Sequence, residues 1–244
     1  MKKTLFSLTA TALLLSGAAF AGDHGAKKAA HWDYDKHGPS CWGDFNKECS
    51  DGKAQSPINI VTADTIPLDA DAALLLNQDY CAEAKVIDNG HSIKVTMEDA
   101  GSITAGCVDY KLLQFHFHGY SEHTVDGKQY DLVAHLVHQS EGGDLAVVGV
   151  LFEEGEANPF LDKVLKNVGK EAMLNVDEML PVNTENYYHY QGSLTTPPCS
   201  EGVQWYVLKE SVTASKEQLA KFRKYYSNNY RPVQAVNDRK VQAN

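Results

Sequence analysis

Hydrophobic and polar residues alternate along much of the middle of the chain, as expected for β-strands that bury one face. Five runs show this pattern or are rich in β-branched residues: 92–97, 110–118, 131–137, 146–152 and 204–208. Clusters of Asp, Asn and Gly separate the runs and are typical of turns. The pattern predicts a mainly β (α+β) fold with one large central sheet.

Two later segments carry helical signals instead. Asn158 and Pro159 can form the cap and first turn of a helix, because a proline is tolerated where the backbone N–H has no partner. Ser215 and Gln218 form a capping box that opens a second helix, expected to run through Tyr226. The sequence contains no internal repeat and no linker. It therefore predicts a single domain with a few short peripheral helices.

The first 21 residues resemble a signal peptide. Lys2 and Lys3 precede an apolar run over 5–19, and Ala19-Phe20-Ala21 has the small-x-small form of a cleavage site. A membrane anchor is the competing interpretation, but the run is shorter than the roughly 20 residues that a span requires. We expect residues 1–21 to be removed. The remaining single domain, over 22–244, would have no membrane span and would be periplasmic or secreted.

The composition is that of a soluble globular protein, with 43% hydrophobic and 22% charged residues. The formal net charge is -10, and it becomes -12 when Lys2 and Lys3 are lost with the leader. A nucleic-acid partner is not expected, because a polyanion is bound by clustered positive charge.

Five cysteines lie in the predicted mature chain, so at least one thiol is unpaired: Cys41, Cys49, Cys81, Cys107 and Cys199. No C-x-x-C spacing is present, which argues against a thiolate metal site or a thioredoxin-type site. One or two structural disulfides are the simplest interpretation for an exported protein. Spacing alone leaves their connectivity open.

Three histidines form the main candidate site. His116 and His118 are two residues apart on a predicted strand, so both imidazoles lie on one face. His135 lies in the next predicted strand, within reach of an antiparallel return. Three imidazoles with an open fourth position suit catalytic zinc, although copper or cobalt accept the same ligands.

The H-x-H pattern has a second interpretation, the first motif of a cupin barrel. His116, His118 and Glu122 fit that motif. Tyr110 and Gln129 stand where the cupin pattern has glycine. The cupin interpretation is therefore the weaker one.

Seven motifs along the chain occur in the order found in the α-class carbonic anhydrases. They are 55–60 (QSPINI), 89–91 (NGH), 114–118 (QFHFH), 121–127 (SEHTVDG), 135–138 (HLVH), 193–199 (SLTTPPC) and 231–234 (RPVQ). From about His31 to Arg239 the chain resembles this family, and its secreted bacterial members in particular. The resemblance implies a single domain with a large central twisted mixed β-sheet. It also implies a Zn²⁺ cofactor, and CO₂ and bicarbonate as substrates.

The resemblance assigns roles to residues around the metal. His116, His118 and His135 match the zinc ligands, so that a zinc-bound hydroxide would attack CO₂. Thr195 matches the residue whose hydroxyl accepts a hydrogen bond from this hydroxide and donates one to the carboxylate matching Glu122. Thr196 matches a residue that contacts substrate or bicarbonate.

A second group of matches concerns the proton and the substrate. His91 matches the proton shuttle, and Tyr34 and Asn89 match residues that order the water chain. We expect Lys94 to lower the pKa of His91 by like-charge repulsion. The residues that match the apolar wall for CO₂ are Val137, Val147, Leu194 and Trp205.

The chain departs from the family at one partner of a metal ligand. Gln114 matches the acceptor for the second N–H of His116, but Val133 stands where many members have a glutamate that serves His135 in this way. Water, a backbone carbonyl or another side chain must substitute. We expect zinc to be held less tightly than in relatives with the carboxylate.

The resemblance also implies a disulfide between Cys49 and Cys199, which would hold the Thr195 loop. A second bridge between Cys81 and Cys107, leaving Cys41 free, is one option for the remaining cysteines. A homodimer is plausible by analogy with secreted bacterial relatives. The alternative to an enzyme is a binding module on the same fold that has lost catalysis, but such proteins typically lack one or more of the zinc histidines.

Overall fold

The computed structural model describes residues 31–77 and 80–244, so the predicted signal peptide over 1–21 lies outside the described residues. His31–Asn244 form one compact unit. No helix within the described ranges has both the length and the apolar character needed to cross a membrane.

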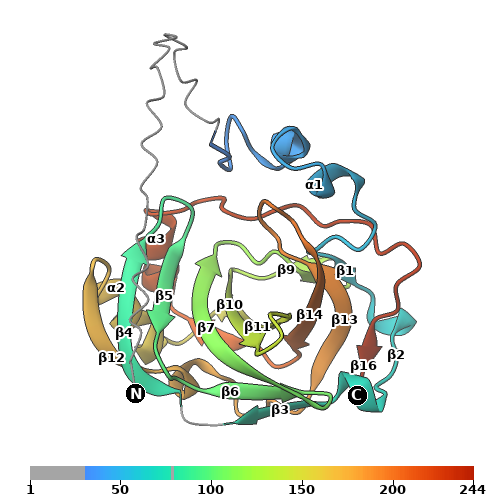
Figure 1. The fold of residues 1–244 in the computed structure, drawn as a ribbon. Coiled ribbons are helices and arrows are strands. Elements are labelled where there is room, and N and C mark those ends of the chain that lie inside the picture. The colour runs from blue at the N-terminus through green and yellow to red at the C-terminus, as the bar shows by residue number, and fades with distance from the viewer. Residues whose placement is uncertain (1–30, 78–79) are drawn as a thin grey trace, which may run out of the picture. The chain divides into compact units, whose positions relative to one another are not determined.

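A 13-stranded sheet dominates this unit (Figure 1). Its main path runs in the order β12 (Lys170–Asn175), β4 (Cys81–Asp88), β5 (Ile93–Met97), β7 (Val108–His118), β10 (Leu132–Ser140), β11 (Leu145–Glu154), β14 (Glu201–Leu208), β13 (Tyr187–Ser193), β16 (Gln242–Ala243) and β2 (Ile66–Pro67). Most neighbours are antiparallel, whereas β11 pairs with β14 in parallel. The sheet is therefore mixed, as predicted.

Shorter strands extend this framework. On the main sheet, β6 (Ser102–Ala105) pairs with both β7 and β3 (Leu74–Asn77), and β15 (Val212–Ala214) pairs with β11. A separate three-stranded sheet contains β1 (Asn59–Ile60), β8 (Thr124–Val125) and β9 (Lys128–Gln129).

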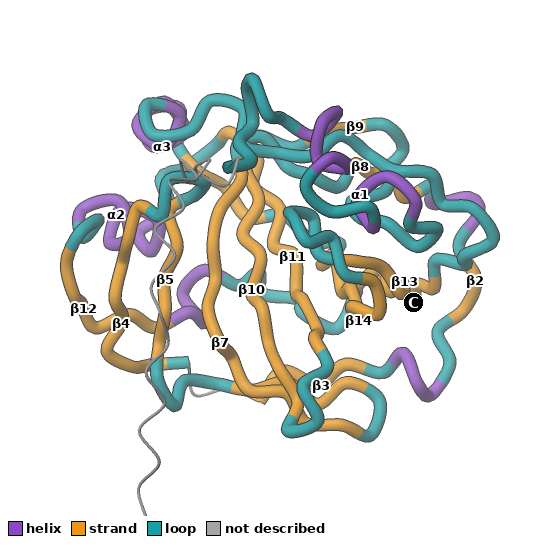
Figure 2. The backbone as a smooth tube through the Cα atoms, turned by 45° about the horizontal axis from the view of Figure 1, so that its top comes forward, coloured by secondary structure: helices purple, strands orange, loops and turns teal. Residues whose placement is uncertain are grey.

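Three short α-helices complete the described fold: α1 (Glu48–Asp51), α2 (Pro159–Lys166) and α3 (Lys216–Arg223). Asn158 caps α2, and Ser215 with Gln218 forms the predicted capping box of α3. Helix α3 ends at Arg223 rather than continuing to Tyr226. Helices α2 and α3 lie together near β4 and β12 (Figure 2). The predicted fold class, a large mixed sheet with a few peripheral helices, is confirmed.

Strand β10 lies near the middle of the sheet and divides two groups of side chains. Ala134 and Leu136 face the main hydrophobic core, while Val133 and Val137 belong to a second apolar cluster. Because side chains alternate along a strand, His135 faces the same side as the two valines. The site is thus built on a strand that is packed on both faces.

Candidate metal centre

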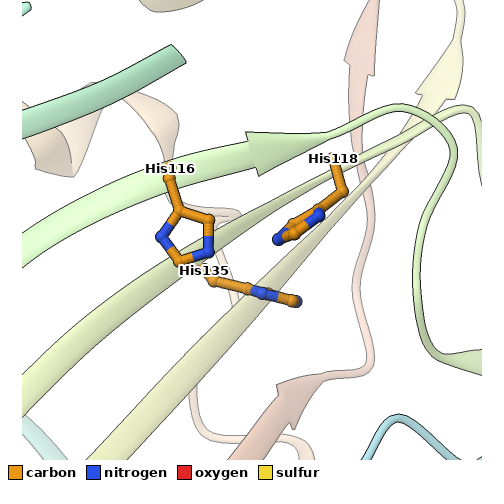
Figure 3. A group of neighbouring side chains, drawn as sticks. All are labelled: His116, His118 and His135. Carbon is orange, nitrogen blue, oxygen red and sulfur yellow. The ribbon is translucent and has the colours of Figure 1, made fainter. Parts of the chain in front are cut away.

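Three histidines converge on one face of the central strands. His116 and His118 come from β7, and His135 comes from β10, where it pairs directly with His116. One ligand nitrogen from each ring lies within 4.8 Å of the others, and the rings gather around a common point (Figure 3). The arrangement can hold one metal ion.

Hydrogen bonds set the direction of the two rings from β7. Nδ1 of His116 lies 2.9 Å from Oε1 of Gln114. Nδ1 of His118 lies 2.5 Å from the backbone oxygen of Asn229. When these Nδ1–H groups donate to their acceptors, Nε2 of each ring carries the free lone pair. Nε2 of His118 is buried and has no hydrogen-bond partner in the described part of the chain.

His135 presents its other nitrogen to the centre. Its Nδ1 lies 3.7 Å from Oε2 of Glu122, and Nε2 of His118 lies 3.6 Å from that same oxygen. Nδ1 of His135 is therefore the atom that can join the other two ligands. Nε2 of His135 is buried and unpartnered among the residues described. Val133, which is fully buried two residues earlier, has no acceptor to offer it.

Burial keeps His116 and His135 in the form that binds metals. It is the largest influence on His116 and His135 and lowers the pKa of each well below its usual value, and the neighbouring His118 lowers both further. Lys94, which pairs with His116 across β5 and β7, adds to the effect on His116. Neutral imidazole is the metal-ligating state.

Glu122 is a buried carboxylate with one fixed oxygen. Its Oε1 accepts a hydrogen bond of 2.8 Å from the backbone N–H of Arg231. Burial raises the pKa of Glu122, and His118 and the hydroxyl of Thr195 oppose this rise. Oε2, the oxygen that faces His118 and His135, makes no hydrogen bond of ordinary geometry with the described residues.

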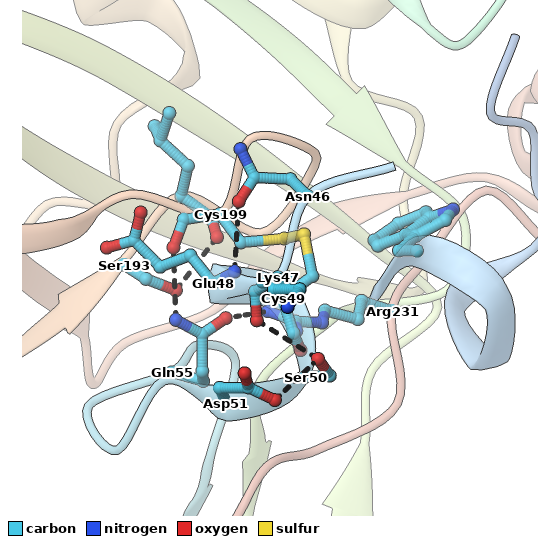
Figure 4. Close-up of a disulfide and its surroundings, with 12 residues drawn as sticks. Asn46, Lys47, Glu48, Cys49, Ser50, Asp51, Gln55, Ser193, Cys199 and Arg231 are labelled. Carbon is cyan, nitrogen blue, oxygen red and sulfur yellow. Dashed lines mark hydrogen bonds between the residues drawn. A yellow bond between two sulfur atoms is a disulfide. The ribbon is translucent and has the colours of Figure 1, made fainter. Parts of the chain in front are cut away.

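A disulfide fastens the loop that carries Thr195. Cys49 and Cys199 are bonded, with sulfur atoms 2.06 Å apart, and they lie 150 positions apart in the sequence (Figure 4). Arg231, which is 2% exposed, donates from its guanidinium to the backbone oxygen of Cys49 and to Oε1 of Gln55, each at 2.8 Å. The disulfide and the Glu122 carboxylate are therefore both held by Arg231.

The second disulfide considered from the sequence does not form. Cys41, Cys81 and Cys107 are all free. Cys81 begins β4, which lies beside β12, whereas Cys107 occupies the turn between β6 and β7. That turn is at the end of β6 remote from β4 (Figure 1). The two thiols thus belong to separate parts of the sheet.

His91 stands between β4 and β5 and stacks on aromatic rings. Its ring centroid is 3.7 Å from Trp32 and 4.8 Å from His31. Burial lowers the pKa of His91, and His31 lowers it further. The expected effect of Lys94 on His91 is wrong: the charge of Lys94 acts on His116, its partner across the strands.

The two residues expected to order water near His91 differ in their surroundings. Oδ1 of Asn89 accepts hydrogen bonds from the backbone N–H groups of His91 and Ser92, at 2.9 and 2.8 Å, so this side chain closes the turn. Tyr34 packs near Trp42 in a small aromatic cluster. Burial raises the pKa of Tyr34 well above its usual value, and Glu122 raises it further.

The four residues expected to form the apolar wall share one cluster. Val137, Val147 and Trp205 are buried in it, and the partly buried Leu194 packs against them. Val137 and Val147 pair across β10 and β11, while Trp205 follows on β14. Thr196 lies beyond Leu194 and Thr195, and its backbone oxygen accepts from the N–H of Cys199 at 2.8 Å.

Sequence reasoning missed three residues that organise this site. Asn229 orients His118 and also donates from its side chain to the backbone oxygens of His91 and Phe117. Arg231 was part of a recognised motif without an assigned role. The buried His123 contacts Tyr190. Asn229 orients His118, and Arg231 holds Glu122, through their own backbone atoms, and side-chain patterns do not reveal such contacts.

The fold and the site define a mainly β protein with a three-histidine group that could hold a metal ion. The family model for eukaryotic-type carbonic anhydrase matches residues 37–244. A carbonic anhydrase of Nostoc sp. is 40% identical over 88% of this chain and 86% of its own length. A carbonic anhydrase of Klebsiella pneumoniae is 41% identical over 87% of this chain and 91% of its own.

Solved structures agree with these relatives. The α-carbonic anhydrase of Thermovibrio ammonificans, in complex with the inhibitor sulfanilamide, superimposes with a TM-score of 0.81 at 45% identity. The match covers 87% of this chain and 99% of that one. The chain belongs to the eukaryotic-type, or α, carbonic anhydrase family, and it is an enzyme of that family.

Proposed function

We propose that the protein catalyses the reversible hydration of CO₂ to bicarbonate and a proton, with Zn²⁺ held by His116, His118 and His135. The observation that carries this proposal is the convergence of three imidazoles, two of them buried, with ligand nitrogens within 4.8 Å of one another in a chain of this family. No cysteine or carboxylate joins the group among the described residues. Three protein ligands leave the open position typical of catalytic zinc.

The donor set fits zinc in type and in protonation. Two of the rings use Nδ1 for a hydrogen bond, so their Nε2 atoms are available as ligands. When bound, zinc would lower the pKa of a water molecule to about 7, a value established for carbonic anhydrases in general, and so would supply a nucleophile at neutral pH.

Thr195 and Glu122 orient the nucleophilic oxygen. The Thr195 hydroxyl donates to Glu122 and can then only accept from the attacking group, which must carry a proton. Arg231 holds the carboxylate in place through its backbone N–H. This pair selects the direction of the oxygen lone pair that meets CO₂.

The substrate is small and apolar, and the cluster of Val137, Val147, Leu194 and Trp205 provides a matching wall. Thr196 adds a polar contact for the bicarbonate product. The wall excludes water from one side of the reacting carbon.

His91 carries the released proton towards bulk water. It is partly exposed, and burial lowers its pKa below the ordinary 6.5, so it is neutral and able to accept a proton at neutral pH. Tyr34 and Asn89 flank the water path between the metal centre and His91.

Stopped-flow CO₂ hydration by the mature chain tests the proposal. We expect activity that disappears after chelation, returns with zinc, and falls to background in His116→Ala. The matched control is His37→Ala, because His37 is a surface histidine with half of its side chain exposed, and it should retain activity. Activity that survives both chelation and His116→Ala would overturn the proposal, and zinc binding without hydration would leave a binding module.

We further propose that the protein is exported. A disulfide and bacterial relatives support this location. A leader over residues 1–21, the periplasm as destination and a homodimer remain proposals. Amino-terminal sequencing of the protein recovered from cells should start at Gly22, and an intact Met1 would contradict cleavage.

A further inference from the structure

Two buried imidazole nitrogens beside the metal centre lack partners among the described residues. They are Nδ1 of His123 and Nε2 of His135, on side chains that are each 1% exposed. Their ring centroids are 6.2 Å apart, and both rings contact Trp205, at 4.7 and 4.8 Å. Leaving two buried polar groups unpaired is energetically unfavourable, so each nitrogen is expected to have a partner.

The hydrogen bonds around His123 indicate that its Nδ1 is a donor. The Ser56 hydroxyl accepts from the N–H of Ser193, and among the described residues the Tyr190 hydroxyl, 2.7 Å away, is the partner left for its own proton, so we assign Ser56 as the donor of this pair. The Tyr190 hydroxyl then donates to Nε2 of His123 at 2.6 Å. A neutral imidazole whose Nε2 accepts a hydrogen bond carries its own proton on Nδ1.

The second nitrogen is a donor for a different reason. Nδ1 of His135 faces the ligand group, because it shares the Glu122 oxygen with Nε2 of His118. A neutral histidine that ligates through Nδ1 keeps its proton on Nε2. Val133 and the apolar cluster around Trp205 supply no acceptor, and the indole N–H of Trp205 is already used by the backbone oxygen of Ser193.

We propose that one buried water molecule accepts hydrogen bonds from Nδ1 of His123 and Nε2 of His135, and that His123 is thereby a positioning residue for the metal ligand. A water oxygen has two lone pairs for the two donors, and buried waters make two to four such bonds. Two hydrogen bonds of ordinary length span up to about 6 Å, and the ring centroids are 6.2 Å apart, so one water molecule between the rings can reach a nitrogen of each. A neutral acceptor is favoured over an anion because the buried Glu122 carboxylate lies close by.

The consequence is a chain of contacts from Ser56 through Tyr190, His123 and water to His135. It takes the place of the direct carboxylate that many relatives have at the position of Val133. The inference rests on the proposed function in one respect, that the three histidines bind zinc.

A high-resolution crystal structure of the zinc-loaded protein tests the water directly. We expect a spherical peak within about 2.7–3.2 Å of both nitrogens. The proposal is overturned if the two nitrogens have no common partner, if a protein atom joins them, or if the peak gains anomalous signal after a bromide soak.

Zinc release to a chelator tests the positioning role. His123→Leu should release zinc about tenfold faster than the parent, as expected when an outer partner of a metal ligand is lost. The control is His138→Leu, because His138 is equally buried but directs Nε2 to Tyr80 and Nδ1 to the oxygen of Leu136. Equal acceleration in the two variants would show a general loss of stability and overturn the role.

A second variant keeps the test decisive if His123→Leu does not fold. Val133→Glu places a carboxylate on the face of β10 that carries His135, so it should displace the water and slow zinc release by about tenfold. In that background His123→Leu should have less effect than in the parent. Unchanged or faster release from Val133→Glu, or an equal effect of His123→Leu in both backgrounds, counts against the proposal.

The failure of this inference is distinct from failure of the proposed function. Zinc absent from the three histidines would defeat the hydratase. Zinc present there with no bridging peak and unaltered release would defeat only the water bridge.

Discussion

Thr195 is the residue whose single hydroxyl has the most specific role in the proposed reaction. Thr195→Val keeps the shape of the side chain but removes the donor to Glu122 and the acceptor for the nucleophile. We expect kcat/KM for CO₂ hydration to fall by about 100-fold, a typical loss for one preorganised polar contact. Zinc content, measured on the same samples, should not change.

Thr196→Val serves as the neighbouring control for this change. It alters the same loop, but its side chain has no part in the Glu122 contact, so the loss should be smaller. If the Thr195→Val enzyme is as active as the parent, the Thr195 hydroxyl does not orient the nucleophile.

At the scale of single residues, the sequence predicts which side chains gather at the site better than it predicts the atoms that hold them in place. The strand period brings His116 and His118 to one face, and the spacing to His135 allows an antiparallel neighbour. The backbone oxygen of Asn229 that orients His118 depends on a segment more than 100 residues away. Local patterns contain no information about such a contact.

The turn between β4 and β5 sets the proton-transfer behaviour at the scale of an element. It places His91 against Trp32, and burial there lowers the pKa of His91 below 6.5. Because only the neutral ring accepts a proton, transfer should weaken as the pH falls through this lowered value. An NMR titration should give a midpoint below 6.5 for His91.

Trp32→Ala tests the cause of that shift. Removing the stacked ring exposes His91, so its midpoint should rise towards 6.5. A midpoint at or above 6.5 in the parent, or one that falls in the variant, would contradict burial as the cause.

Helix α3 offers a test of local stability. Oγ of Ser215 accepts a hydrogen bond from the backbone N–H of Gln218, and Oε1 of Gln218 accepts one from the backbone N–H of Ser215. Ser215→Ala should lower the free energy of unfolding in urea by about 1 kcal/mol. Ser227→Ala, at an exposed loop serine, should change it by less than about 0.5 kcal/mol. Equal losses of unfolding free energy in the two variants would show that the Ser215 cap does not stabilise the helix.

Elements with strong local signals were predictable, and those defined by distant pairing were not. The five alternating runs all overlap strands of the main sheet, and both predicted caps begin helices. Strands β2 and β16 have two residues each and exist because β16 pairs with β13 on one side and with β2 on the other. Two residues are too few to show a period.

The disulfide acts on the whole molecule because it closes a loop of 150 residues. Replacing Cys49 and Cys199 together by serine should lower the free energy of unfolding by about 2–5 kcal/mol, since the unfolded chain regains the freedom that the bond removes. Urea unfolding measures this change. The paired control, Cys81→Ser with Cys107→Ser, should leave stability nearly unchanged, and an equal loss in both pairs would contradict the assignment.

The central claim is that three histidines from β7 and β10 bind one zinc ion and leave a position open. X-ray absorption at the zinc edge of the loaded mature chain tests it most directly. The account predicts three imidazole nitrogens and one oxygen at about 2.0–2.1 Å, and loss of this signature in His116→Ala. A sulfur ligand, a fourth imidazole, or an unchanged spectrum in His116→Ala would contradict it.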